Sequence, residues 1–476
     1  MENSGSTGRR GSTRRALLSA TALTATASPL LAGAAFAEDP EVDGGDGPGN
    51  RIKPQHPEPA LRAVLDQVDA RRIEATIMRL VQFGTRHTLS TQDDPVRGIG
   101  AATEWVYQTM LGIAATSGGR MTVEKQTFIQ PVSPRIPTPT PITNVIATLR
   151  GSEDPQRVYV VSAHLDSRVT DVMNFTSDAP GADDDGSGVA AVLEMARLLA
   201  PHSFKGTLVF VTVAGEEQGL YGSTFMASQM KAANADIQGM FSNDIIGASS
   251  AWDGTKPDPH TVRLFVEGVP TSETPQQTST RQAIGGENDG NSRQLGRFVK
   301  NVAENDSTEM TIRMIWRRDR YLRASDHVSF IRQAYPAARF SEPRENYNHE
   351  HQDTRVENGI QFGDLPEFCD FRYIARVAKV NITTLWSLAA GPGTPKGVRI
   401  AASTLTNDTT LTWTVNPGAA TYEVVWRETT APDWTHAIDV GTAGTVTIDM
   451  VKDNFQFGLR AVDADGRHSP VAFPTP

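Results

Sequence analysis

Cysteine is almost absent from this chain: its 476 residues include only one, Cys369. A single cysteine cannot form an intrachain disulfide, which excludes a scaffold held together by disulfide bridges. No basic block follows the first fifteen residues, and the formal net charge of -10 argues against nucleic acid as a partner. Beyond the N-terminal region, no apolar run has the roughly 20 residues that a membrane-spanning helix needs. The length is ample for a buried core and exceeds that of one ordinary domain.

The N-terminus has the pattern of an export signal. Residues 13–18 (TRRALL) resemble a twin-arginine motif and precede an apolar to weakly polar run, and residues 35–37 (AFA) fit a small-x-small cleavage site. We therefore predict a signal peptide over residues 1–37, export to the periplasm or the extracellular space, and no stable membrane span after the signal is removed. The acidic, glycine- and proline-rich stretch that follows predicts a disordered mature N-terminus over residues 38–58.

The remaining chain divides into two parts. From 59 to 390, apolar β-branched runs alternate with stretches of helical spacing, which predicts an α/β fold with a mostly parallel central sheet sandwiched by helices. Residues 391–396 begin with Gly-Pro-Gly-Thr-Pro and are typical of a linker. From 397 to 476, short strands separated by turn signals predict a small all-β, immunoglobulin-like sandwich.

Two apolar runs in the larger part, 158–163 and 207–214, stop abruptly at charged side chains. We expect both runs to be buried strands. Binding sites in open α/β sheets form outside the carboxyl ends of the strands, so the residues that follow them are expected to face one crevice. The residues in question are His164 and Asp166 after the first run, and Glu216 and Glu217 after the second.

Three consecutive aspartates, 183–185, lie between these two groups. They precede helical spacing over residues 189–196, and the N-terminus of a helix favours negative charge. Taken singly, an aspartate run is more often a solvated turn or helix cap, and a glutamate pair is more often a surface feature. One imidazole and several carboxylates at consecutive strand ends, however, form a mixed nitrogen and oxygen set that suits zinc and related divalent ions.

Two downstream segments offer further ligands for a two-metal centre. Asp244 follows a short apolar run, in the sequence NDIIG. Residues 348–354 (NHEHQDT) contain two histidines in a polar stretch. Each of these segments alone would normally be a turn or a solvated loop.

The ordered set of motifs resembles a known family. HLDS, APGADDDGSG, AGEEQGLYGS, NDIIG and NHEHQDT occur in the order and approximate spacing of the secreted bacterial two-zinc aminopeptidases, the bacterial leucyl aminopeptidase family. The resemblance covers residues 60–390 and implies a zinc aminopeptidase-like fold. The C-terminal 80 residues resemble a fibronectin type III module.

The resemblance implies a role for each candidate residue. One zinc would be held by His164 and Asp244, the other by Glu217 and His349, with Asp184 bridging the two ions. Glu216 would be the general base, and Asp166 would orient the His164 ring. His349 is preferred to His351 because it lies three residues before the QDT sequence, as the family ligand does.

The implied reaction is hydrolysis of the N-terminal peptide bond of peptides or proteins with a free N-terminus, through a hydroxide held between two zinc ions. Three alternatives stay open at this point. A hydrolase with the same two-zinc fold could act as a carboxypeptidase or on N-acyl amino acids. A glutaminyl cyclase has a similar fold but uses one zinc. A secreted binding protein could carry the large domain as a scaffold without catalysis.

Overall fold

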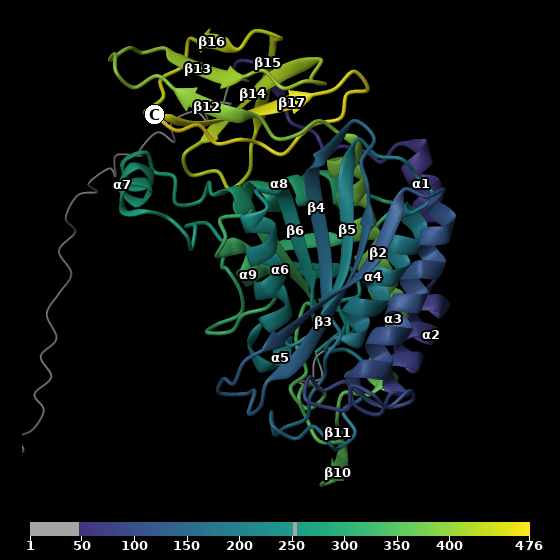
Figure 1. The fold of residues 1–476 in the computed structure, drawn as a ribbon. Coiled ribbons are helices and arrows are strands. Elements are labelled where there is room, and N and C mark those ends of the chain that lie inside the picture. The colour runs from purple at the N-terminus through teal and green to yellow at the C-terminus, as the bar shows by residue number, and fades with distance from the viewer. Residues whose placement is uncertain (1–46, 251–254) are drawn as a thin grey trace, which may run out of the picture. The chain divides into compact units, whose positions relative to one another are not determined.

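The computed structural model describes residues 47–250 and 255–476, and Figure 1 shows their fold. Residues 48–476 form one compact unit. The predicted signal peptide and residues 38–46 of the predicted disordered segment lie outside the described residues. Within the described part of the chain, no helix is both long enough and apolar enough to cross a membrane.

An eight-stranded mixed sheet forms the centre of the larger part, with the strand order β2-β3-β5-β4-β6-β9-β7-β8. The pairs β5–β4, β4–β6, β6–β9 and β7–β8 are parallel, and the pairs β2–β3, β3–β5 and β7–β9 are antiparallel. The strands are β2 (Met121–Gln130), β3 (Thr140–Leu149), β4 (Asp154–His164), β5 (Gly206–Val213), β6 (Asp236–Asn243), β7 (Thr261–Val266), β8 (Thr311–Ile315) and β9 (Ala337–Ser341). This confirms the predicted α/β class.

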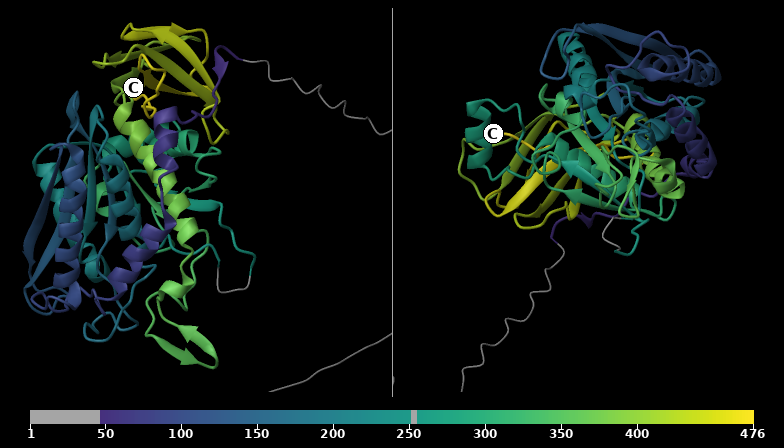
Figure 2. Two further views of the ribbon diagram at one scale, coloured as in Figure 1. Left: turned by 90° about the vertical axis from the view of Figure 1, so that its right-hand side faces the viewer. Right: turned by 90° about the horizontal axis from the view of Figure 1, so that it is seen from below.

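Helices cover both faces of the sheet. The helices are α1 (Pro59–Leu65), α2 (Ala70–Val81), α3 (Gly98–Ala114), α4 (Gly186–Leu199), α5 (Glu216–Gly219), α6 (Tyr221–Ala232), α7 (Pro275–Ala283), α8 (Asn291–Ala303), α9 (His327–Ile331) and α10 (Phe371–Ala390), with 3-10 turns at Ala115–Ser117 and Pro366–Phe368. Figure 2 shows the long helix α10, in light green, beside the purple N-terminal helices.

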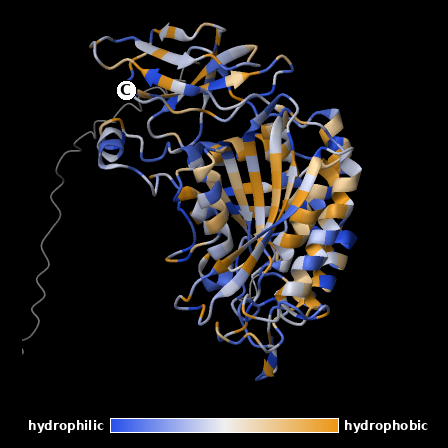
Figure 3. Cartoon of the chain, viewed as in Figure 1, coloured by the Kyte–Doolittle hydropathy of each residue, from blue (hydrophilic) through white to orange (hydrophobic). Residues whose placement is uncertain are grey.

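Alternation along the central strands explains these two layers. Leu208 and Phe210 of β5 belong to the apolar cluster that includes α2, α3, α4, α8 and α10, whereas Val209 and Val211 belong to the cluster that includes α6 and α9. Successive side chains of a strand point to opposite faces, so a strand buried on both faces must be apolar throughout. The central strands are accordingly largely orange in Figure 3.

The C-terminal part consists of two small antiparallel sheets. One has the order β12-β13-β16 and the other β1-β15-β14-β17. The strands are β12 (Lys396–Ile400), β13 (Thr409–Thr414), β14 (Thr421–Glu428), β15 (His436–Gly441), β16 (Thr445–Ile448) and β17 (Phe455–Val462), with β1 at Asn50–Arg51. Side chains from both sheets, including Trp413, Tyr422 and Leu459, share one apolar core.

Strand β1 corrects part of the prediction of disorder over residues 38–58. Asn50 and Arg51 pair with Ala437 and His436 of β15, so this segment supplies an edge strand to the C-terminal sheet. Trp426 donates from Nε1 to the backbone oxygen of Pro48 at 2.9 Å. The hydrophilic composition that predicted disorder is compatible with an edge strand because β1 relies on backbone hydrogen bonds and on a partner far along the chain.

Candidate metal centre

The three adjacent parallel strands β5, β4 and β6 bring the predicted residues to one edge of the sheet. His164 is the last residue of β4, Asp244 directly follows β6, and Glu216, the first residue of α5, lies three positions after the end of β5. Because parallel strands end at the same edge, residues that lie 80 positions apart meet there.

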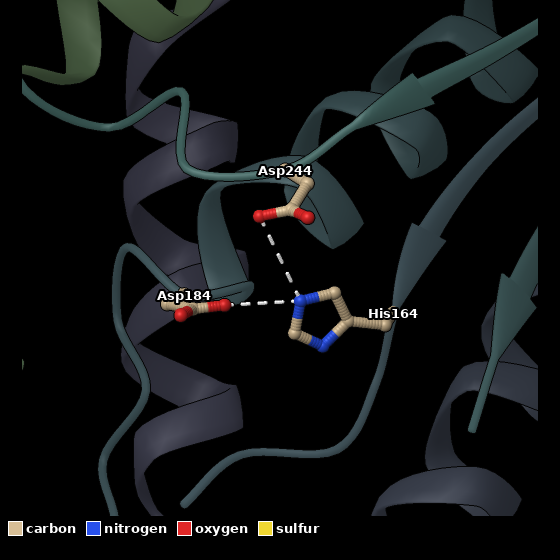
Figure 4. Close-up of side chains that lie close together, drawn as sticks. All are labelled: His164, Asp184 and Asp244. Atoms are coloured by element: carbon tan, nitrogen blue, oxygen red, sulfur yellow. Dashed lines mark ion pairs between the residues drawn. The ribbon is translucent and has the colours of Figure 1, made fainter. Parts of the chain in front are cut away.

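The first half of the site consists of His164, Asp184 and Asp244 (Figure 4). Nε2 of His164 lies 3.0 Å from Oδ1 of Asp184 and 3.9 Å from Oδ1 of Asp244. All three side chains are buried. One potential ligand atom from each lies within 4.8 Å of the others, which is a separation that a single ion could bridge.

The second half uses the other oxygen of Asp184. Oδ2 of Asp184 lies 2.7 Å from Nε2 of His351, and the same nitrogen lies 3.0 Å from Oε1 of Glu217. Glu350 joins this group, since one of its oxygens lies within 4.8 Å of ligand atoms of Asp184 and His351. The Asp184 carboxylate therefore faces both halves of the site, one oxygen to each.

His349 does not lie in this second half, where the sequence predicted it. Its ring stacks on that of Phe368 with centroids 3.4 Å apart, and its Nδ1 is 2.9 Å from Nδ2 of Asn346. His351 has a left-handed backbone conformation with φ of 52°, and it is this residue that faces Asp184. The structure therefore replaces His349 by His351 as the candidate ligand.

Asp166 connects two of the strand ends. Its backbone oxygen lies 3.0 Å from Nδ1 of His164, which leaves Nε2 of that ring to face the acidic groups. Its carboxylate accepts hydrogen bonds from the backbone N–H groups of Glu216 at 3.2 Å and Glu217 at 3.1 Å. Thr88 donates to the same carboxylate at 2.9 Å. Asp166 thus fixes the ring of His164 through its main chain and the start of α5 through its side chain.

The loop that carries Asp184 is held by two further carboxylates. Asp364 accepts the backbone N–H groups of Asp183 and Asp184, both at 2.8 Å. Asp185 caps α4 through Gly188, 3.0 Å away, and accepts the backbone N–H of His164 at 2.9 Å. The peptide bond between Asp184 and Asp185 is cis. Asp183 and Asp185 thus accept hydrogen bonds from backbone N–H groups, Asp183 from that of Gly247 at 2.6 Å. Asp184, between them, presents one oxygen to each of the two histidines.

The electrostatics of the site favour a cation. Burial lowers the pKa of His164, but Asp185 and Asp184 raise it well above the usual value, and Glu217 and Asp184 do the same for His351. Both shifts reflect the negative charge of the buried carboxylates. Divalent cations would compensate the same carboxylates, and imidazole nitrogens together with carboxylate oxygens are a donor set that zinc accepts. The residues present fit zinc.

Glu216 differs from the other carboxylates of the site. Among the described residues, no ion pair joins Glu216 to His164 or His351, whereas Glu217 lies 3.0 Å from His351, and Glu216 is partly exposed. Burial of its carboxyl group raises its pKa well above the usual value, and the negative charge of Glu217 adds to this shift. Glu216 is therefore a carboxylate beside the ligand groups that is free to exchange protons.

Arg339, which the sequence gave no reason to select, holds Asp244 in place. This completely buried arginine of β9 donates from Nη2 to Oδ1 of Asp244 at 2.9 Å and to its backbone oxygen at 3.0 Å. Burial tends to raise the pKa of Asp244, but the charge of Arg339 holds it far below its usual range. Nη1 of Arg339 donates to Asp319 at 3.0 Å.

Arg168 and Glu350 were also missed. Arg168 donates from Nε to Oε2 of Glu217 at 2.9 Å. Glu350 pairs with Arg323 and lies between the two histidines of the NHEHQDT motif, so the motif itself was the available signal for it. Arg168 directly follows the HLDS motif, and this position was the available sign that it lies near the site.

Comparison with known proteins gives one family. The model of peptidase family M28 matches residues 144–360. A probable zinc metalloprotease of Pyrenophora teres f. teres is 50% identical over 432 residues, which cover 90% of this chain and 89% of that protein. A probable zinc metalloprotease of Pyricularia oryzae is 51% identical over 436 residues, covering 90% of this chain and 87% of that protein.

Solved structures are more distant. The LapA aminopeptidase of Legionella pneumophila has a TM-score of 0.49 at 16% identity, with 69% of this chain and 74% of that one covered. A glutaminyl cyclase of Porphyromonas gingivalis has a TM-score of 0.45 at 18% identity, with 67% of this chain and 97% of that one covered.

Proposed function

This chain belongs to peptidase family M28 and is 50% identical to a probable zinc metalloprotease, and on that premise we propose that it uses two zinc ions to remove the N-terminal residue of peptides. The observation that carries the proposal is the position of Asp184. Its two carboxylate oxygens face two different histidines, at 3.0 Å and 2.7 Å, as a carboxylate shared by two ions must.

The proposed ligand sets follow from the two halves of the site. His164 and Asp244 would hold one zinc, Glu217 and His351 the other, and Asp184 both. When bound, paired zinc ions polarise the scissile carbonyl group and make water more acidic. Glu350 is a further candidate for the second set, because its carboxylate lies within the same group of ligand atoms.

Glu216 is the proposed general base. It sits at the N-terminus of α5 with its backbone N–H held by Asp166, so its position relative to Glu217 is fixed. Its carboxylate would take a proton from the attacking water and deliver it to the leaving amine, a role that typically contributes about 10²- to 10⁴-fold in rate. Asp166 would not take part in the reaction itself. It would orient His164 and the turn that carries Glu216 and Glu217.

Restriction to the N-terminal residue rests on the resemblance of the ordered motifs to bacterial leucyl aminopeptidases. Export rests on the twin-arginine-like N-terminus, and the assignment of residues 397–476 to the fibronectin type III class rests on strand arrangement. The β12-β13-β16 sheet opposed to β15-β14-β17 is compatible with that class. We therefore propose for this chain the N-terminal restriction, export, and a C-terminal module of the fibronectin type III class.

Two chromogenic substrates test the activity. The zinc-loaded enzyme is expected to release p-nitroaniline from leucine p-nitroanilide and not from the N-acetylated form, and Glu216→Ala is expected to abolish release while zinc stays bound. Release of p-nitroaniline from the acetylated form would keep the metal site but discard the requirement for a free α-amine. Failure of both substrates, with zinc bound, would refute the aminopeptidase and favour a carboxypeptidase, a glutaminyl cyclase or a binding protein.

A further inference from the structure

Two arginines that are accessible to solvent contact Glu217. Arg168 donates from Nε to Oε2 of Glu217 at 2.9 Å, and its side chain is 19% exposed. Arg135 donates from Nη1 to the backbone oxygen of Glu217 at 2.8 Å and is exposed. Arg339, by contrast, is completely buried against Asp244 and cannot meet a ligand from solvent. Two solvent-accessible positive charges thus border the second half of the site.

The loops that carry the two arginines are well anchored. In the loop between β2 and β3, Ser133 and Ile136 exchange backbone hydrogen bonds of 2.9 and 3.0 Å, and Ile136 is fully buried. Ser133 also lies 2.6 Å from the hydroxyl of Tyr221 in α6. In the loop after β4, Ser167 donates to the backbone oxygen of Ala179 at 2.8 Å. Both guanidinium groups are therefore presented from ordered backbone.

Arg168 has further contacts besides Glu217. Its Nη2 lies 2.6 Å from Nδ1 of His351, and its Nη1 donates to the backbone oxygens of Val169 at 3.2 Å and Thr170 at 3.5 Å. A guanidinium has five N–H donors, so Arg168 can offer a ligand its positive charge and the remaining N–H of Nη2. Within residues 47–250 and 255–476, the guanidinium of Arg135 makes one hydrogen bond, so it too has N–H groups to offer.

We propose that Arg168 and Arg135 bind the C-terminal carboxylate of a short peptide substrate, so that dipeptides are the preferred substrates. The inference rests on the proposed function and names its substrate class. Guanidinium groups bind carboxylates with paired, charge-assisted hydrogen bonds. A chain with a net charge of -10 repels anions in general, which makes two cations at this position notable.

Peptide length decides which carboxylate can reach the two arginines. In a dipeptide the terminal carboxylate lies about 4 Å from the scissile carbonyl carbon, because one residue separates them. Each additional residue moves it up to about 3.3–3.6 Å farther away. Arg168 contacts Glu217, a proposed zinc ligand, so its guanidinium lies close to the place where the scissile bond would bind. A substrate carboxylate can therefore reach Arg168 only if it is close to the scissile bond.

A pair of substrates that differ only in their C-terminal group tests the proposal. The value of kcat/KM for Leu-Leu is expected to exceed that for Leu-Leu-amide by about 10- to 100-fold, the worth of hydrogen bonds to a charged group. In Arg168→Gln and Arg135→Gln this ratio is expected to fall toward 1, whatever the absolute rates. Arg399→Gln removes an exposed arginine of β12 and serves as the matched control that keeps the ratio.

Binding provides a readout that does not need turnover. The reduced-bond analogue of Leu-Leu and its carboxamide are titrated into the zinc-loaded enzyme by calorimetry, with zinc content measured for each variant. The proposal is supported if the analogue with a free carboxylate binds more tightly than its carboxamide, and if Arg168→Gln loses this difference while it retains zinc. Equal loss for acid and amide, or loss of zinc, overturns it, because Arg168 would then only orient Glu217 and His351.

Two further outcomes separate the competing explanations. A preference for Leu-Asp-amide over both Leu-Leu-amide and Leu-Leu would place the recognised carboxylate on a side chain and overturn recognition of the C-terminus. A wild-type enzyme that, with zinc bound, cleaves neither leucine p-nitroanilide nor Leu-Leu would refute the proposed function, and the calorimetric comparison would then decide the carboxylate proposal by itself.

Discussion

Oδ2 of Asp184 lies 2.7 Å from Nε2 of His351, although these residues are far apart in the sequence and the family resemblance pointed to His349 instead. The other oxygen of the same carboxylate lies 3.0 Å from His164. This sharing of one carboxylate by two imidazoles is the geometric basis for a two-ion site. Because His351 makes this contact and His349 does not, substitutions at the two positions can test which of them is the zinc ligand.

Substituting the two neighbouring histidines should give opposite results. His351→Ala removes the nitrogen that faces Asp184 and Glu217, so the zinc content is expected to fall from two ions per chain toward one and activity to be lost. His349→Ala removes a ring that stacks on Phe368 and should keep both ions. Atomic emission on the dialysed proteins measures the content. A loss of zinc in His349→Ala with full zinc in His351→Ala would reverse the assignment.

Replacing Arg339 by methionine should weaken the other half of the site. The substitution leaves Asp244 and Asp319 buried without their shared cation, and loss of one partner of a buried ion pair typically costs about 3–5 kcal/mol. We expect lower thermal stability without zinc and weaker binding of one ion, measured by competition with a chromogenic chelator.

Arg339→Lys is the informative companion to that variant. A lysine keeps the positive charge but cannot bond both acidic partners with a planar fork. If charge compensation is what matters, it restores much of the zinc affinity that the methionine variant loses. If both variants bind two zinc ions as tightly as the parent, Arg339 has no role in positioning Asp244.

The sequence could identify those site residues that follow strands. His164, Glu216 and Glu217 were found because a buried parallel strand has a continuous apolar run that ends visibly at a polar residue. The aspartates at 183–185 were found because a helix pattern begins directly after them. Each of these signals is local.

The remaining site residues depend on contacts that have no local pattern. Arg339 lies in a short strand that is buried throughout, and its partners are 20 and 95 positions away, so no nearby residue marks it as part of the site. His349 and His351 share one loop, where no periodicity tells which ring turns inward. Strand β1 was missed for the same reason, because its partner β15 is near the other end of the chain.

Asp289 should tie the C-terminal sheets to the larger part of the chain. Its carboxylate lies 2.9 Å from Nη1 of Arg297 in α8 and 2.7 Å from Nη2 of Arg427 in β14, and all three groups are buried. Asp289→Asn would leave two guanidinium groups without a counter-charge, so about 3–5 kcal/mol of stability should be lost.

Calorimetry tests this coupling through the number of transitions. We expect the parent to unfold in one transition and Asp289→Asn to unfold at lower temperature, with the C-terminal sheets melting first. Asp453→Asn makes the same change of charge at an exposed position of the C-terminal part and should change little. Equal melting of the two variants would show that the buried ion pairs do not stabilise this junction.

His468 should make the chain less stable in mild acid. Its Nδ1 lies 3.0 Å from Oε1 of Gln55, and burial together with the charge of Arg460 lowers its pKa to about 4, although Glu423 opposes the shift. The folded-state pKa is thus below the unfolded value of about 6.5, so the unfolded chain takes up the proton first. The stabilising contribution is complete above pH 6.5 and is lost as the pH falls toward 4, by at most about 3 kcal/mol.

The variant His468→Gln isolates this contribution, because carboxylates that titrate in the same range are common to both proteins. Glutamine keeps a hydrogen-bond donor for Gln55 but takes up no proton. We expect the difference in melting temperature between pH 7 and pH 4.5 to be smaller in the variant than in the parent, measured on zinc-free protein so that metal release does not contribute. An identical pH dependence in the two proteins would mean that His468 is protonated in the folded state as readily as in the unfolded chain.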